Sequence, residues 1–220
     1  MVRSSDMGGL PLRGLYVCTH YLPNRLGLKV ADPAWGVHTE FEVKLLEVDL
    51  PSLRRKLVAL GAISSGTQNM KRYVYHPHDM VPGSHRWLRL RDDGRKTTLT
   101  FKHIKSDKLG DTDELEVEVG DFDSMHLLLT KAGILPTSYQ ENRRESWELK
   151  GHPGVEVCID WWPLLEPYVE VEGPDEATVM KIVKLLGFTP DQVTTLNTME
   201  LYERKGIAVH DHKELKFEGV

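Results

Sequence analysis

The sequence predicts an α+β fold in which eight antiparallel β-strands carry charged side chains on one face and apolar side chains on the other. Two observations lead to this prediction. A unit made of a Glu-x-Glu strand and a following helix occurs three times along the chain. Apolar and charged residues also alternate with a period of two in most of the other strand candidates. We therefore expect helices to cover the apolar face of the sheet.

The first repeated unit begins with the strand at 40–44, which reads Glu-Phe-Glu-Val-Lys. Asp49 and Pro51 then form the capping and first-turn signature of a helix. Leucines along one face give this helix an apolar stripe, and we expect it to end at Gly61.

The second and third units follow the same plan. The strand at 114–119 precedes a helix that is expected to begin at Asp121 and to end at Gly133. The strand at 170–172 precedes a helix that ends at Gly187. The remaining strand candidates, which bring the total to eight, are 71–75, 86–91, 97–103, 139–149 and 155–160.

The folded domain is expected to extend from residue 38 to residue 206. Residues 1–37 contain scattered glycine and proline without a sustained period, which is typical of a loosely structured extension. Residues 207–220 are expected to form a polar C-terminal tail. The chain of 220 residues, 40% of them hydrophobic, is long enough to bury the core of one such domain.

The charge balance and the cysteine content restrict the class of protein. Lys and Arg number 28 against 33 Asp and Glu, and the net charge of −5 argues against a general surface for nucleic acid or anionic membranes. Cys18 and Cys158 lie far apart, and no stretch is typical of a signal peptide or a spanning helix. We therefore expect a cytoplasmic protein with a small-molecule partner, and a homodimer is compatible with the sequence.

The charged rows of these strands could share one face of the sheet. Their members are Glu40, Glu42, Lys44, Arg89, Arg91, Lys102, Glu114, Glu116, Glu118, Asp160, Glu170 and Glu172. In an open sheet this face would meet water, and its charges would form weak cross-strand pairs. With eight strands the sheet can instead curl until the charged face lines a lumen. The spacing alone leaves both arrangements open.

A charged lumen would be costly unless charged ligands occupied it. Carboxylates are hard oxygen ligands that suit Mg²⁺ or Mn²⁺, while Arg and Lys pair with phosphate oxygens. A polyphosphate with bound divalent metal ions would satisfy both sets of side chains.

Several motifs resemble those of a known family. Glu40-Phe41-Glu42-Val43-Lys44 resembles the Glu-x-Glu-x-Lys signature of the CYTH superfamily, whose members are also called triphosphate tunnel metalloenzymes. Later elements follow in the matching order: Arg89-Leu90-Arg91, Thr100-Phe101-Lys102, Glu114-Leu115-Glu116, Arg144 before Trp147, Asp160, and Glu170-Val171-Glu172. The chain is most similar to bacterial members that are often labelled class IV adenylate cyclases. The resemblance implies an eight-stranded antiparallel β-barrel, the triphosphate tunnel, with a charged lumen and helices packed outside.

The resemblance also implies roles for these residues. Metal ions, Mg²⁺ or Mn²⁺, would be held by Glu40, Glu42, Glu114, Glu116, Asp160, Glu170 and Glu172. Substrate phosphates would be bound by Lys44, Lys71, Arg89, Arg91, Lys102 and Arg144, and the catalytic residues would be Lys44, Glu116 and Asp160. Lys71 and Arg72 occupy adjacent strand positions, so at most one should face inward, and Lys71 is slightly favoured.

Two departures from the family pattern concern the basic side of this site. Many members carry Lys-x-Arg in the sixth strand, whereas this chain has Asn142-Arg143-Arg144. The first cation is thus missing, or it is replaced by Arg143 on the opposite face. Thr112 and Asp113 stand where an arginine often precedes the second Glu-x-Glu.

The activity implied by the resemblance is metal-dependent hydrolysis of inorganic triphosphate or a related linear triphosphate. A class IV adenylate cyclase would use the same charged residues, so the motifs do not separate the two. A non-catalytic polyphosphate sensor is a third alternative, but a pure anion binder would gain nothing from so many carboxylates. Trp161 and Trp162 are the only candidates for contacts with a nucleobase, and we expect them to pack at the barrel rim instead.

Overall fold

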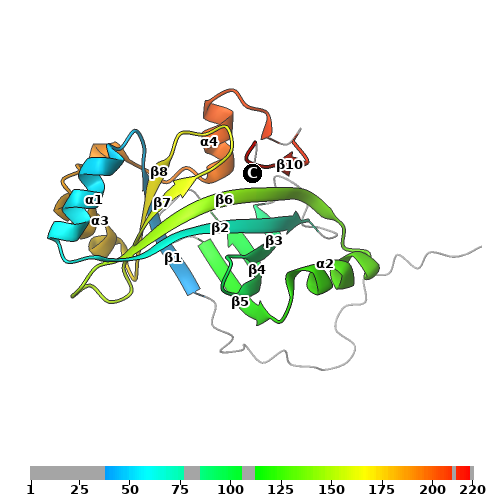
Figure 1. The fold of residues 1–220 in the computed structure, drawn as a ribbon. Coiled ribbons are helices and arrows are strands. Elements are labelled where there is room, and N and C mark those ends of the chain that lie inside the picture. Colours follow the sequence, from blue (N-terminus) through cyan, green and yellow to red (C-terminus); the bar gives the residue numbers. More distant parts are fainter. Residues whose placement is uncertain (1–37, 77–84, 106–111, 210–211, 219–220) are drawn as a thin grey trace, which may run out of the picture. The chain divides into compact units, whose positions relative to one another are not determined.

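The computed structural model of the chain describes residues 38–76, 85–105, 112–209 and 212–218 (Figure 1). All of them belong to one structural unit. The predicted N-terminal extension, 1–37, lies outside the described residues.

Eight antiparallel strands pair in the cyclic order β1-β5-β4-β3-β2-β6-β7-β8, and β8 pairs again with β1. The strands are β1 (His38–Leu45), β2 (Ile63–Tyr75), β3 (Arg86–Asp92), β4 (Thr97–Ile104), β5 (Thr112–Val119), β6 (Pro136–Glu148), β7 (Glu156–Trp161) and β8 (Tyr168–Gly173). The link between β1 and β5 is the shortest, because it runs only from the pair His38↔Glu114 to the pair Glu40↔Thr112. The predicted α+β fold with an antiparallel eight-stranded barrel is confirmed.

Strand β2 is longer than the predicted segment 71–75. It contains 13 residues and pairs with β6 almost along its whole length. Its first half is polar and includes Ser64, Ser65 and Gly66, so it has no apolar alternation by which a strand could be recognised.

Three helices follow the Glu-x-Glu strands, as predicted. They are α1 (Leu50–Ala59), α2 (Phe122–Lys131) and α3 (Glu176–Leu186). The carboxylates of Asp49 and Asp121 accept hydrogen bonds from backbone N–H groups in the first turns of α1 and α2, which confirms both predicted N-caps. Gly187 has φ 99° and ends α3 in the left-handed conformation that favours glycine. None of the helices in the described ranges is long and apolar enough to cross a membrane.

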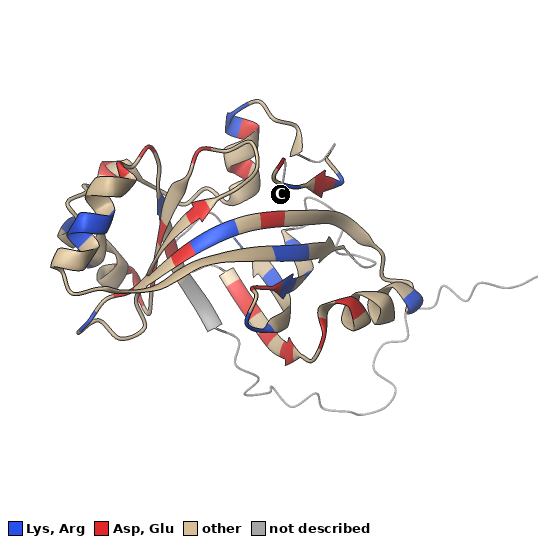
Figure 2. Cartoon of the chain, in the orientation of Figure 1, with Lys and Arg blue, Asp and Glu red and all other residues tan. Residues whose placement is uncertain are grey.

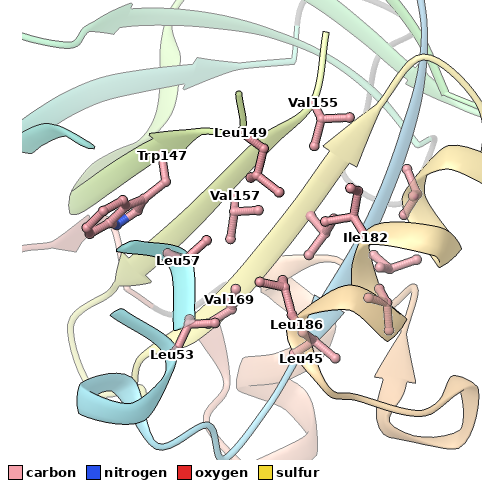
Figure 3. Packing of buried hydrophobic residues seen from close by; sticks show 14 of the residues in the cluster. Leu45, Leu53, Leu57, Trp147, Leu149, Val155, Val157, Val169, Ile182 and Leu186 are labelled. Carbon is pink, nitrogen blue, oxygen red and sulfur yellow. The ribbon is translucent and has the colours of Figure 1, made fainter. Parts of the chain in front are cut away.

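The main hydrophobic core lies between α1, α3 and the outward face of β1, β6, β7 and β8 (Figure 3). Leu57 of α1 and Ile182 of α3 are fully buried in it. They pack with the apolar rows of the strands, including Val43, Leu45, Trp147, Val157, Ile159, Val169 and Val171. Because the apolar rows face the helices, the alternating charged rows must face the other way.

A smaller core lies on the neighbouring strands. Phe122 and Leu129 of α2 pack there against Tyr75 of β2 and Leu90 of β3. Helix α2 therefore covers this part of the barrel from outside.

The C-terminal region packs on the barrel. Helix α4 (Thr198–Arg204), the 3₁₀ turn η1 (Pro190–Gln192) and the short strands β9 (Val193–Thr194) and β10 (Glu214–Leu215) were not predicted. Strand β10 pairs in parallel with β6, and Val209 and Leu215 are buried against α4. The segment after residue 206 is therefore docked on the barrel and is more than a polar tail. A two-residue strand is too short to give a periodic signal.

Candidate functional site

The charged rows of the strands surround a cavity of about 1590 Å³. Figure 2 shows basic and acidic segments on several of the strands around it. The predicted site residues that line it are Glu42, Lys44, Arg89, Arg91, Lys102, Glu114, Glu116, Arg144, Glu170 and Glu172. Strand alternation thus brings most of the predicted residues together in one cavity.

Arg144 of β6 is bound by two acidic residues from β7 and β8. Its Nε donates to Asp160 Oδ1 at 2.9 Å and its Nη2 to Asp160 Oδ2 at 2.5 Å, while Nη2 also contacts Glu170. Burial disfavours the charge of Arg144, but Asp160 and Glu170 outweigh it and keep the Arg144 pKa above its usual value. Asp160 is fully buried and does not line the cavity, and it accepts hydrogen bonds from Arg144 and Asn142.

Lys44 of β1 lies between two glutamates. Its Nζ contacts Glu42 and lies 3.3 Å from Glu170 Oε1. Burial would lower the pKa of Lys44, but the two carboxylates raise it above its usual value, so the ammonium group stays charged. Burial tends to raise the pKa of Glu170, but Arg144 and Lys44 lower it below its usual value.

A second ion-pair network lies across β3, β4 and β5. Arg89 Nη2 is 2.9 Å from Glu114 Oε1, and Lys102 Nζ is 3.0 Å from Glu114 Oε2. Arg91 Nη2 is 3.5 Å from Glu116 Oε2. Arg89 and burial together lower the pKa of Arg91 to about 10, and Glu116 partly offsets them. The basic residues on this wall are thus held in place by carboxylates that also reach the cavity.

The inward-facing member of the pair at 71 and 72 is Arg72. Lys71 is 40% exposed on the outer face, where its Nζ lies 3.6 Å from Asp92 and 4.5 Å from the centre of the Phe122 ring. Arg72 instead lines the cavity and is the direct cross-strand partner of Arg91, so both side chains share the inner face. The structure corrects the expectation for Lys71, because the register of β2 against β3 is invisible in the sequence.

Three glutamates form an acidic row on the opposite wall. Glu42 of β1 lies directly across from Glu172 of β8, which in turn lies across from Glu156 of β7. Glu156 also lines the cavity, but it was not predicted as a site residue. Its alternation with Val155 and Val157 could have identified it.

The chemistry of this row fits a divalent metal ion. Residues directly opposite each other on antiparallel strands have Cβ atoms about 4.5–5.5 Å apart, so the three carboxylates can converge on one hard cation. In the described side chains, however, no three His, Cys, Asp or Glu residues are already arranged to hold a metal, and Glu42 is turned towards Lys44. The backbone of Glu40 lies in β1, but its side chain lies outside the described residues.

The remaining candidates lie at the edges of the site. Glu118 is exposed but lines the cavity near the end of β5. Trp161 packs against the main core, with the guanidinium of Arg54 5.8 Å from its ring centre. Trp162 is buried and lines the cavity, and the guanidinium of Arg72 covers its ring at 4.6 Å.

Solved structures from several organisms resemble this fold. The PH1012 protein from Pyrococcus horikoshii is 22% identical, with a TM-score of 0.61 over 74% of this chain and 98% of its own. A candidate adenylate cyclase from Vibrio parahaemolyticus is 10% identical, with a TM-score of 0.64 over 76% of this chain and 99% of its own. HpAC1 from Hippeastrum is a candidate adenylyl cyclase described as having a dominant triphosphatase activity. It is 15% identical, with a TM-score of 0.52 over 79% of this chain and 98% of its own.

A search of curated proteins finds no match. The profile of the CYTH domain matches residues 38–195, which include all eight barrel strands and the helices between them. With the barrel and its charged cavity, this match shows that the chain belongs to the CYTH domain family.

Proposed function

We propose that this protein hydrolyses inorganic triphosphate or a related linear triphosphate with the help of divalent metal ions. The observation that carries the proposal is the convergence of Lys44, Arg89, Arg91, Lys102 and Arg144 on one cavity that also contains carboxylates. Cations on several walls can bind the oxygens of successive phosphoryl groups at once. The activity described for HpAC1 supports the proposal.

In this mechanism the basic residues bind and orient the phosphoryl chain. Lys44 and Arg144 remain charged because of their carboxylate partners, so both can stabilise charge that develops on phosphate oxygens. Asp160 positions Arg144 with two parallel hydrogen bonds. When bound, divalent metal ions, Mg²⁺ or Mn²⁺, would be held by the row of Glu42, Glu172 and Glu156 and would neutralise phosphate charge.

Glu116 is placed to accept a hydrogen bond from a water molecule in the cavity. Burial tends to raise its pKa, but Arg91 and a hydrogen bond from Thr100 lower it, so the group is a carboxylate at neutral pH. A charged carboxylate beside bound phosphate can orient the attacking water.

The alternative function is cyclisation of ATP to cyclic AMP, as the name of the Vibrio parahaemolyticus relative suggests. A cyclase must hold the adenosine so that its 3′ hydroxyl is in line with the α-phosphate. Trp87 and Trp162 line the cavity, and Arg72 already covers one face of the Trp162 ring. We therefore favour the hydrolase.

One assay tests the proposal. The purified protein is incubated with tripolyphosphate, thiamine triphosphate or ATP, with Mg²⁺ or Mn²⁺, and every product is identified. We expect kcat/KM to be higher for tripolyphosphate than for ATP. Arg144→Gln should lose most of this activity, while Arg143→Gln, on the outer face over the Phe217 ring, should retain it. Abundant cyclic AMP with intact tripolyphosphate would support the cyclase instead.

A further inference from the structure

Arg72 is a buried cation in the cavity wall, and within the described residues no carboxylate lies within ion-pair distance of it. We propose that Arg72 binds an anionic oxygen of the substrate's phosphoryl chain. This inference rests on the proposed function, because the anion is taken to be a triphosphate.

The direct contacts of Arg72 are with neutral groups. Its Nη2 donates to Asn142 Oδ1, and its guanidinium lies over the ring of Trp162. Neither partner is charged, and Arg72 is only 8% exposed. A buried charge without a counter-charge in contact with it is costly. An arginine at this position therefore favours a role in binding an anion.

The charged groups nearest to Arg72 are mostly other cations. Arg91 is its direct cross-strand partner. Burial, followed by Arg89, Arg91 and Arg144, lowers the pKa of Arg72 well below its usual value, and Asp160 offsets only part of this. A phosphate oxygen in this position would offset both burial and repulsion.

Unsatisfied donors of four residues line the same cavity. The Nε atoms of Arg72 and Arg89, the Nε1 atom of Trp162 and the hydroxyl of Thr98 are buried without a hydrogen-bond partner. Thr98 lies directly across from Arg91, which lies directly across from Arg72. Buried polar groups in native proteins are rarely left unpaired, and N–H groups can only donate. This cluster therefore fits an acceptor-rich anion.

Asn142 of β6 links Arg72 to Asp160 by two hydrogen bonds. Asn142 is neutral and donates through Nδ2 to Asp160 Oδ1 at 3.0 Å. Its Oδ1 accepts from Arg72, which reaches across from the adjacent strand β2. The positive charge beside Asn142 is thus supplied by Arg72 of the neighbouring strand β2.

A structural role and an anion-binding role for Arg72 predict opposite effects of its removal on the stability of the ligand-free protein. If Arg72 served mainly to hold the fold, its removal would lower the melting temperature of the ligand-free protein. If it serves to bind an anion, its removal relieves burial and repulsion, so the ligand-free protein should melt at the same or a higher temperature.

The test compares the full chain with Arg72→Gln and, as a matched control, Arg143→Gln, which removes the same charge on the outer face. Binding of tripolyphosphate is measured by calorimetry in metal-free buffer, where turnover is not required. We expect Arg72→Gln to weaken the Kd by about ten- to a hundredfold, and the control to bind like the wild type. The double variant Arg72→Gln/Asn142→Lys places the positive charge on β6 instead of β2. Most of the lost affinity should then be recovered.

The outcomes separate this inference from the proposed function. Unchanged affinity in Arg72→Gln would overturn the inference, and so would a lower ligand-free melting temperature combined with no recovery in the double variant. Absence of binding to the wild type would overturn it as well. If the wild type binds tripolyphosphate in an Arg72-dependent way but hydrolyses no triphosphate, the inference stands and the proposed hydrolysis fails.

Discussion

Replacing Glu156 by glutamine tests whether the acidic row is a metal site. Glu156 lines the cavity and has a glutamate directly across from it on each neighbouring strand, Glu172 on β8 and Glu148 on β6. It has no hydrogen bond or ion pair within the described part of the chain. The exchange keeps the size of the side chain and removes one negative charge from the row.

Glu156→Gln is expected to raise the stability of the domain without metal and to lower it with metal, relative to the wild type. A like-charged pair across two strands costs about 0.2–1 kcal/mol. The pair with Glu172 should dominate, because Glu148 is exposed to solvent. Without metal, Glu156→Gln should thus stabilise the domain by up to about 1 kcal/mol, which for a domain of this size raises the melting temperature by about 2–4 °C.

With metal at a hundredfold excess over its Kd, the wild type should gain about 2.7 kcal/mol. That corresponds to a rise of about 5–11 °C in melting temperature. If the variant binds the ion tenfold more weakly, it loses about 1.4 kcal/mol of this gain. Wild type and variant should therefore exchange their order of stability when metal is added.

The assay is thermal unfolding in EDTA and in a titration of Mg²⁺ or Mn²⁺, with Glu176→Gln as a control that removes an exposed charge from α3. Two results would refute the reasoning: a variant that melts below the wild type in EDTA, or a metal-induced shift equal to that of the wild type. The control should show the wild-type shift.

Three further outcomes are expected. Glu42→Gln should lower turnover by orders of magnitude at saturating metal while circular dichroism shows an intact fold, and near-normal turnover would contradict its assignment as a metal ligand. Ile182→Ala should destabilise the domain by about 2–5 kcal/mol in urea unfolding, because the side chain is fully buried between α3 and the sheet. Trp162→Leu should lower tripolyphosphate and ATP turnover together, because the indole packs on Arg72 and binds no base, whereas a selective loss of ATP turnover would favour the cyclase.

The alternation of apolar and charged residues was enough to predict the strands and most of their inner face, but closure into a barrel was predicted from the family resemblance. In β1, for example, Val43 faces the core while Glu42 and Lys44 face the cavity, as the period of two requires. The N-caps at Asp49 and Asp121 could also be predicted, because they depend only on residues close in sequence: a carboxylate and the first turn of the helix that follows it.

Features that depend on distant segments could not be predicted in the same way. Arg72 faces inward only because β2 pairs with β3 in one register, and a shift by one residue would have turned Lys71 inward. Helix α4 is short, and its buried residues Leu201 and Tyr202 are defined by the strands against which they pack. Tertiary contacts decide both features.

Glu156 and Arg72, which have no ion pair among the described residues, carry opposite charges and line the cavity at opposite ends of β7. Glu156 begins this strand, and Trp162, which carries Arg72 on its ring, follows the last residue of the strand. Six residues of extended chain separate them by about 20 Å. Between them, Lys44, Arg144, Asp160 and Glu170 neutralise one another. The ligand-free cavity is thus negative towards Glu156 and positive towards Arg72. A metal-bound triphosphate also separates its charges, so this field would orient it with the metal towards the acidic row and phosphate oxygens towards Arg72.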